Sequence, residues 1–552
     1  MRTRVLVAVG LVLAVLVGPS ARGSSVGSAP LRSERTADRS KAENDSTSLP
    51  SIGRQGGFQS ATSRGDNSRD GWYPNEPGLG PSIVGSSQFG QLFVTRLNGQ
   101  IYAQPLLVGG VVFVATETDW TYGLNPVTGA VEWSRRLGTS FRDASLLCGD
   151  LTPNLGVTST PTVDPETGVV YVVDQAYVAG HIGWYMHAIN PANGVEMPHF
   201  PVEIEGPASN NPLQLFRPTK ELQRPGLLFL NGVVYAAFGS HCDYPPYAGF
   251  IAGVSTKGRQ TTLWTTQGAG SGSGGGIWQG GGGLVSDGAN QILFSDGNGE
   301  NDNAAHPNGT IPGHSPPANL ADSVVRLVVQ PDGSLKATDF FSMYDDPSVD
   351  GHDWDLAGAP TALPSEFSTP EYPHLLVVTG KEGIVYLLNR ENLGGIREGP
   401  GGGDLVVGEY GPNGEGIGTA GAWPGQGGYV YVATDSGARA GAPGEVDVYR
   451  FTTTSEGVPR LSLEAIGSQR AVFGVSGPLV TSNGTDPGSA VVWVVDGAHL
   501  QAYDAVPVNK ELKLIGTWFV GNTDPFNPPG IGNNVVYVAN QAGLLYGFAQ
   551  KQ

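Results

Sequence analysis

Cysteine and charge are both scarce in this chain of 552 residues. The two cysteines, Cys148 and Cys242, form neither a CxxC nor a CxxCH motif, so the sequence supports neither a structural zinc site nor covalently attached haem. Only 15% of the residues are charged, and acidic residues outnumber basic ones to give a net charge of −19. The sequence contains no cluster of Lys and Arg that would form a basic patch. Nucleic acid and anionic membrane surfaces are therefore not expected partners.

Long apolar runs are absent beyond the first residues. Arg2 and Arg4 precede an apolar run over residues 5–17, followed by small residues up to Gly23. This pattern is typical of a secretory signal peptide, and the run is too short to span a membrane. We therefore expect residues 1–23 to be removed and the protein to be secreted or extracytoplasmic, with no membrane span.

The next stretch, residues 24–76, has few bulky apolar residues and many Ser, Arg, Asp and Gly. Such a composition buries too little apolar surface to offset the loss of chain entropy. We expect a disordered linker over residues 24–76 and a folded domain over residues 77–552.

Amphipathic stretches with a helical period are nearly absent, whereas glycine is abundant at 83 residues. Glycines and other turn residues separate short runs of β-branched and aromatic residues, such as GVVFVAT from Gly110, GVVYVVD from Gly168 and AVVWVVD from Ala490. Several runs lead into an Asn-Pro-x-x-Gly turn, as at Asn125 and Asn190. Proline fixes φ and glycine accepts a positive φ, so this pattern indicates β-hairpins.

The repeat predicts an all-β protein. About eight repeats of roughly 60 residues, each a small antiparallel sheet, are typical of a β-propeller. We expect an eight-bladed propeller of four-stranded antiparallel blades, with seven blades as the alternative. The strand over residues 89–99 is expected to complete the last blade beside the C-terminal segment, which would remove the open sheet edge.

The segment IYAQPLLVGGVVFVATETDWTYGLNPVTGAVEWSRRLG, residues 101–138, resembles the PQQ-type repeat of quinoprotein alcohol dehydrogenases. The resemblance extends over most of the chain from about residue 83, and Trp133 matches the tryptophan that docks on the neighbouring blade. It implies an eight-bladed propeller that holds the quinone PQQ and a calcium or lanthanide ion at its central axis.

The segment GHDWDLAG, from Gly351 to Gly358, is a more specific match. The resemblance implies that Asp355 is the catalytic base and approaches the metal. Ala357 matches calcium-type members, since lanthanide-type members place an Asp there. A hard divalent cation prefers oxygen ligands, and a carboxylate can remove the alcohol proton.

Other segments imply the remaining site residues. By resemblance Lys381 contacts the quinone oxygens, Trp278 stacks on the quinone ring, and Asn298 is a metal ligand. Two features depart from the family. Its adjacent cysteines are replaced by Cys148 alone, and its Glu metal ligand is missing, with Asp243 the nearest carboxylate. Both cysteine-bearing segments approach the axis in the family, which implies a Cys148–Cys242 disulfide near the pocket mouth.

Two functions remain open at this stage. The first is an exported PQQ- and calcium-dependent oxidoreductase that acts on an alcohol-type small molecule and passes electrons to a separate acceptor. The second is a non-catalytic propeller that binds a protein or glycan partner. Each candidate side chain also has a structural interpretation. Asp353 and Asp355 fit a solvated turn, Lys381 a hairpin turn, and Trp278 packing between blades.

Overall fold

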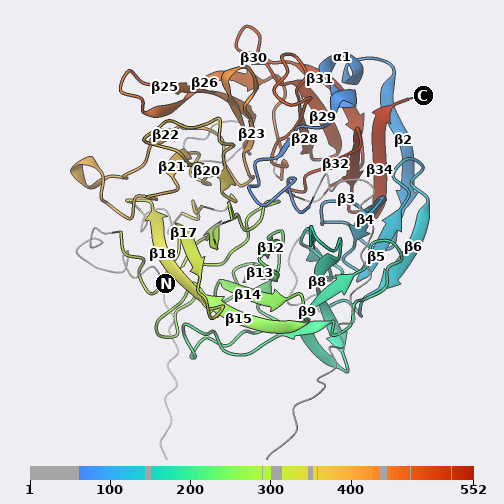
Figure 1. The fold of residues 1–552 in the computed structure, drawn as a ribbon, viewed down its shortest axis with the longest axis vertical. Coiled ribbons are helices and arrows are strands. Elements are labelled where there is room, and N and C mark those ends of the chain that lie inside the picture. Colours follow the sequence, from blue (N-terminus) through green and yellow to red (C-terminus); the bar gives the residue numbers. More distant parts are fainter. Residues whose placement is uncertain are drawn as a thin grey trace, which may run out of the picture. The chain divides into compact units, whose positions relative to one another are not determined.

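The short apolar runs form the strands of eight sheets. The computed structural model describes residues 61–142, 151–288, 290–299, 314–345, 352–356, 358–435, 444–472, 474–523 and 525–551, all within the unit Ile52–Gln552. Across these residues, eight mostly antiparallel sheets surround a common centre (Figure 1). The structure is an eight-bladed β-propeller, as predicted.

The blades follow one another along the chain. The first four contain β3 (Leu106–Val108), β4 (Val111–Ala115), β5 (Trp120–Leu124) and β6 (Val131–Arg136); β7 (Thr162–Val163), β8 (Val170–Val178), β9 (His181–Ile189) and β10 (Val202–Ile204); β11 (Glu221–Leu222), β12 (Leu228–Leu230), β13 (Val233–Ser240), β14 (Phe250–Ser255) and β15 (Arg259–Thr265); and β16 (Gln291–Ser295), β17 (Ser323–Val329) and β18 (Leu335–Ser342).

The second half of the ring follows the same plan. Its blades contain β19 (Thr361–Ala362), β20 (Leu375–Thr379), β21 (Val385–Asn389) and β22 (Gly408–Tyr410); β23 (Gly421–Trp423), β24 (Tyr429–Ala433), β25 (Val446–Thr453), β26 (Pro459–Gly467) and β30 (Glu511–Leu512); β1 (Trp72–Tyr73), β27 (Leu479–Thr481), β28 (Val491–Asp496), β29 (His499–Asp504) and β31 (Leu514–Phe519); and β32 (Gly530–Gly532), β33 (Val535–Ala539), β34 (Leu544–Gln550) and β2 (Phe89–Arg96).

Helices are few and short in the described ranges. There the α-helix is α1 (Pro81–Val84), and the 3-10 helices are η1 (Pro77–Leu79), η3 (Pro400–Gly402) and η4 (Gly425–Gly427). Among the described residues, no helix has the length and apolarity that a membrane crossing requires.

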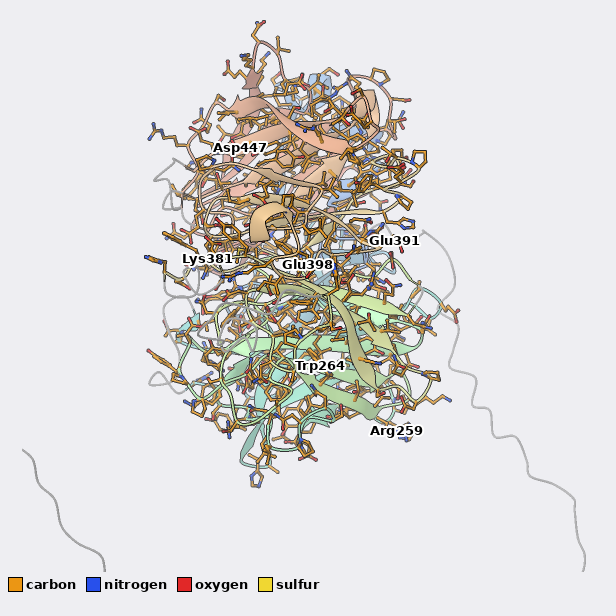
Figure 2. The ribbon with its side chains drawn as sticks, turned by 90° about the vertical axis from the view of Figure 1, so that its left-hand side faces the viewer. Arg259, Trp264, Lys381, Glu391, Glu398 and Asp447 are labelled. Carbon is orange, nitrogen blue, oxygen red and sulfur yellow. The ribbon has the colours of Figure 1, made fainter. Side chains whose placement is uncertain are left out.

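The core lies between neighbouring blades. In β20, Leu376 and Val378 pack toward the preceding blade, whereas Leu375 and Val377 pack toward the following one. Because both faces of the strand are buried, its sequence is continuously apolar rather than alternating. Large aromatic side chains fill the same interfaces. Trp264, which Figure 2 labels, packs edge-on against Phe294 of the next blade, with ring centroids 5.9 Å apart.

The two ends of the domain close the ring together. The N-terminal strand β2 pairs with the C-terminal strand β34 in an antiparallel ladder that places Val94 opposite Tyr546. This pairing confirms the predicted closure and leaves no open edge between the first and last blades.

Residues 61–75 form a segment that contacts successive blades, which differs from the linker expected over residues 24–76. Its backbone carbonyls accept hydrogen bonds from residues in or beside the inner strands of five blades: Ala61 from Val163, Asn67 from Ser286, Ser68 from Ala362, Asp70 from Ala422 and Gly71 from Val480. Residues 61–71 are held mainly by hydrogen bonds, which composition does not reveal, whereas Trp72 and Tyr73 also pack into the hydrophobic core. Residues 24–60 lie outside the described residues.

Two arginines of this segment are fully buried. Arg69 donates four hydrogen bonds, to the carbonyls of Ser63, Leu227 and Leu284 and to the Thr62 hydroxyl. Arg64 donates three, to the carbonyls of Arg69, Ala420 and Pro478. Four of these bonds reach backbone carbonyls of the blades, those of Leu227, Leu284, Ala420 and Pro478, and so tie the segment to several blades.

Candidate functional site

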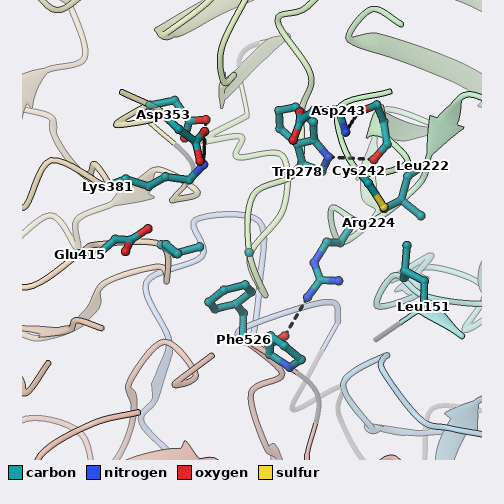
Figure 3. Close-up of a pocket in the computed structure, with 15 residues that line it drawn as sticks. Leu151, Leu222, Arg224, Cys242, Asp243, Trp278, Asp353, Lys381, Glu415 and Phe526 are labelled. Carbon is teal, nitrogen blue, oxygen red and sulfur yellow. Dashed lines mark hydrogen bonds and ion pairs between the residues drawn. The ribbon is translucent and has the colours of Figure 1, made fainter. Parts of the chain in front are cut away.

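A pocket of about 340 Å³ opens at the centre of the propeller. Its walls come from loops between blades on several sides of the ring, which places it where the blades converge (Figure 3). It is lined by Leu151, Leu222, Arg224, Ser240, Cys242, Asp243, Trp278, Gly280, Asp353, Asp355, Lys381, Glu415, Ile417, Pro525 and Phe526.

Lys381 joins two carboxylates of the pocket. Its ammonium lies 2.9 Å from Asp353 Oδ1 and 3.1 Å from Asp355 Oδ2. The Asp355 side chain is 2% exposed, whereas that of Asp353 is 66% exposed. The pair therefore has an inner carboxylate shielded from solvent and an outer one at the pocket entrance.

The backbone fixes this arrangement. Lys381 lies in the tight turn between β20 and β21, where Gly383 adopts a φ of +88° and its amide donates to the carbonyl of Gly380. The backbone amide of Lys381 also donates to the carbonyl of Asp355 at 2.9 Å. The hairpin turn that the sequence indicated thus positions the lysine beside Asp355.

The electrostatics of the pocket bring the pKa of the Asp355 carboxyl close to neutral pH. Burial raises the pKa of Asp355, Lys381 lowers it and Asp353 raises it, with a net value of about 6. For Lys381, burial lowers the pKa, but the two carboxylates outweigh this effect and raise it. The lysine therefore stays charged while the inner carboxylate titrates close to physiological pH.

Asn298 completes the group from the loop that follows β16. Its Nδ2 donates to Asp353 Oδ1 at 2.5 Å. Among the described residues, neither the buried Oδ1 of Asn298 nor that of Asp355 has a hydrogen-bond partner. Buried oxygen atoms without partners are costly in a folded protein and call for an explanation.

Trp278 presents its indole to the pocket from the loop between β15 and β16. Its Nε1 donates to the carbonyl of Ser240 at 3.1 Å. Glycines pack closely around the ring: a Cβ on Gly239, Gly276 or Gly297 would lie 2.6, 2.5 or 2.7 Å from an indole atom. These positions cannot accept a side chain without moving the tryptophan, which is therefore held in place as one wall of the pocket.

Two further carboxylates border the pocket. Asp243 accepts a hydrogen bond from the Tyr247 hydroxyl at 3.1 Å, and burial raises its pKa despite that bond. Glu415, between β22 and β23, also has a raised pKa, because burial outweighs the opposing effect of Lys381. Sequence reasoning missed Glu415, since its Gly-rich segment carries no family motif.

Arg224 and Phe526 form another part of the wall and were also missed. Arg224 Nη2 donates to the carbonyl of Pro525 at 2.8 Å, and its guanidinium carbon lies 5.7 Å from the centroid of the Phe526 ring. Neither residue lies in a segment with a recognisable signal. Only the fold brings the segment after β31 against the loop between β11 and β12.

The structure brings most of the sequence-predicted residues together. Asn298 and Lys381 both donate to Asp353, and Lys381 also donates to Asp355, while Asp243 and Trp278 line the same pocket. Cys242 lines it as well and is not a free thiol. Cys148 and Ala357 lie outside the described residues, so the Cys148–Cys242 disulfide and the calcium-type assignment stay predictions.

Solved structures share this fold at low sequence identity. A quinohemoprotein alcohol dehydrogenase from Comamonas testosteroni is 14% identical, and the match covers 89% of this chain and 80% of that chain with a TM-score of 0.59. A quinohemoprotein alcohol dehydrogenase from Pseudomonas putida HK5 is 13% identical, covering 90% and 80% with a TM-score of 0.57. A europium-containing methanol dehydrogenase is 14% identical, covering 89% and 98% with a TM-score of 0.59.

These matches confirm the resemblance to quinoprotein alcohol dehydrogenases at the level of the fold. No protein-family model matches the sequence, and no curated protein matches it.

Proposed function

We propose that the central pocket binds a PQQ-type quinone together with a divalent cation, and that the protein is an exported oxidoreductase of alcohol-type substrates. One observation carries the proposal: within the part of the chain that the structure describes, Asp355 and Asn298 each leave a buried oxygen without a hydrogen-bond partner, in the group joined by Lys381. The N-terminal sequence supports export.

The residues present fit a hard cation. Calcium takes carboxylate and amide oxygens as ligands, and the unpartnered Oδ1 atoms of Asn298 and Asp355 are of these two kinds. Four carboxylates and two cationic side chains line the pocket, so a divalent ion would balance its charge. Asp243 offers a further carboxylate oxygen on the opposite wall.

They also fit a planar quinone. The indole of Trp278 is held against glycine backbone, and an aromatic ring of this kind can stack on a flat ligand. Lys381 keeps its charge and can stabilise negative charge on a quinone oxygen. A bound quinone would supply the acceptor for the hydride that leaves the substrate carbon.

Asp355 is the group that would take the substrate's hydroxyl proton. A general base works best with a pKa near the operating pH, and burial raises the pKa of Asp355 to about 6. Above this pKa the carboxylate is ionised. Its ion pair with Lys381 orients Oδ2. The other oxygen, Oδ1, is then left for a ligand. Because the chain carries no CxxCH motif, the electrons would pass to a separate acceptor.

A non-catalytic binding role is the second candidate, and one observation favours it. Among the residues that the structure describes, no three Asp, Glu, His or Cys side chains are grouped to hold a metal ion. A cation in this pocket would therefore depend on the Asn298 amide and on oxygens of a bound ligand. A propeller that has lost the cofactor would instead offer this face to a protein or glycan.

Dye-linked oxidation separates the two candidates. Purified protein supplied with PQQ and calcium is screened against primary alcohols, and we expect substrate-dependent dye reduction. Asp355→Asn should lower kcat by about 10²-fold or more, the usual contribution of a general base. Asp332→Asn, in the exposed turn between β17 and β18, is the matched control. Absence of turnover with every alcohol would favour the binding role.

A further inference from the structure

The two cationic side chains of the pocket differ in their ion pairing. Lys381 is engaged by two carboxylates, whereas Arg224 forms no ion pair with any described residue and donates to the carbonyl of Pro525. A guanidinium has five N–H donors in a planar fork. Most of the donors of Arg224 are therefore available to a ligand in the pocket.

Arg224 differs in burial and in number of hydrogen bonds from the arginines that have a structural role in this protein. Arg64 and Arg69 are fully buried and donate three and four hydrogen bonds to neighbouring groups. Arg224 is only half-buried, lines the pocket and makes one such bond. The contrast indicates that its remaining donors serve something other than the fold.

The position of Arg224 is fixed by its neighbours. Gln223 Nε2 donates to the carbonyl of Pro225 at 2.7 Å, and the amide of Gly226 donates to the carbonyl of Gly282 at 2.9 Å. These bonds hold the backbone on both sides of the arginine, while the Phe526 ring lies beside its guanidinium. A ligand therefore meets a preorganised cation, which lowers the entropy cost of binding.

We propose that Arg224 selects ligands that carry a carboxylate. A planar guanidinium matches a carboxylate with two parallel hydrogen bonds, and Leu151, Leu222 and Phe526 line the pocket with it to receive an apolar body. The inference rests on the proposed function in taking this pocket as the ligand site. The carboxylate belongs either to the substrate, whose hydroxyl then faces Asp355, or to the cofactor.

The test compares two probes that differ only in this group: 4-(hydroxymethyl)benzoate and its methyl ester. Their affinities for the purified full-length protein are measured by calorimetry, without any cofactor. We expect the acid to bind at least tenfold more tightly than the ester. Arg224→Met should abolish this ratio, and Arg224→Lys should keep part of it. Arg96→Met is the matched control, because exposed Arg96 also donates one bond to a carbonyl, that of Ala542.

Repeating the titration after PQQ and calcium are added identifies the source of the carboxylate. A preference for the acid that persists assigns Arg224 to the substrate, whereas one that disappears when PQQ binds assigns it to the cofactor. If PQQ does not bind but the acid preference holds, the proposed cofactor fails and the role of Arg224 stands. Equal affinity for acid and ester, or a ratio unchanged in Arg224→Met, would overturn the inference.

Discussion

Lys381 holds Asp355 through two separate contacts. Its ammonium lies 3.1 Å from Asp355 Oδ2, and its backbone amide donates to the Asp355 carbonyl at 2.9 Å. One contact fixes the backbone and the other fixes the side chain. The buried carboxylate is therefore oriented by a single turn of the neighbouring hairpin.

Removing this lysine should raise the pKa of Asp355. Lys381 lowers that pKa while burial and Asp353 raise it to a net value of about 6, and a close opposite charge is typically worth 1–3 units. In Lys381→Met we expect the titration of Asp355 to move up by at least about one unit. Difference infrared titration of the protonated carboxyl band measures it, with Asp355→Asn to assign the band and Lys381→Arg to retain the charge. An unchanged midpoint in Lys381→Met would contradict the assigned role.

Gly297 should not accept a side chain, because the Trp278 ring and the Asp355 carboxylate pack closely against its Cα. A Cβ there would lie 2.7 Å from the Trp278 ring and 2.9 Å from Asp355 Oδ2. We expect Gly297→Ala to displace the indole and to weaken binding of a flat ligand by about tenfold, as followed by quenching of tryptophan fluorescence. Gly80→Ala is the control, since its Cβ would have ordinary contacts at 3.8 Å or beyond. Equal quenching in both variants would refute the glycine packing argument.

The buried Arg69 should contribute strongly to the stability of the propeller. Its replacement by Met leaves the carbonyls of Leu227 and Leu284 without this donor, and loss of buried charged hydrogen bonds costs about 3–5 kcal/mol. Chemical denaturation should show a drop of this order in the free energy of unfolding. In exposed Arg96→Met the change should stay within about 0.5 kcal/mol. A drop below about 1 kcal/mol for Arg69→Met would mean that the hydrogen bonds of Arg69 to the blades contribute little to the stability of the propeller.

Stability should fall at alkaline pH because of His187 in β9. Its ring lies 3.1 Å from Asp174 Oδ1 and 2.6 Å from Glu196 Oε1. Burial lowers the pKa of His187, but the two carboxylates outweigh it and raise the pKa to about 9. The protonated ring thus adds stability that is complete below its unfolded pKa of about 6.5 and is lost as pH rises through 9.

The corresponding measurement is the free energy of unfolding from pH 6 to pH 10. In the native protein it should fall by roughly 3 kcal/mol across this window, and His187→Gln should lack that component. His374→Gln is the control, because His374 pairs with Glu391 at the exposed surface. A pH dependence that is the same in the native protein and in His187→Gln would exclude this origin.

The sequence predicted the fold well because blade strands are local. Runs such as those of β4 and β28 combine β-branched and aromatic residues with a preceding turn residue, and both faces of these strands are buried between blades. The closure of β2 on β34 could be inferred because an open edge would be unfavourable. The signal for each blade strand is local, whereas the closure joins segments from opposite ends of the domain.

The site was predictable only where a short motif carried it. Asp355, Asn298 and Lys381 lie in segments that resemble a known family, and the structure joins them: Asn298 and Lys381 donate to Asp353, and Lys381 also donates to Asp355. Arg224 and Glu415 carry no such motif, and they reach the pocket because distant loops converge at the centre of the ring. Residues 61–71 were missed for a related reason, since their burial depends on hydrogen bonds that composition does not reveal.

Calorimetric titration of the purified protein with PQQ, with and without calcium, tests the central claim most directly. We predict micromolar binding that requires calcium and is lost in Asp355→Ala, because Asp355 supplies an unpartnered buried oxygen to the proposed cation site. Binding that is equally strong without calcium, or that survives in Asp355→Ala, would contradict the proposed role of this carboxylate. No binding under either condition would contradict the cofactor itself and leave the pocket as a site for a different ligand.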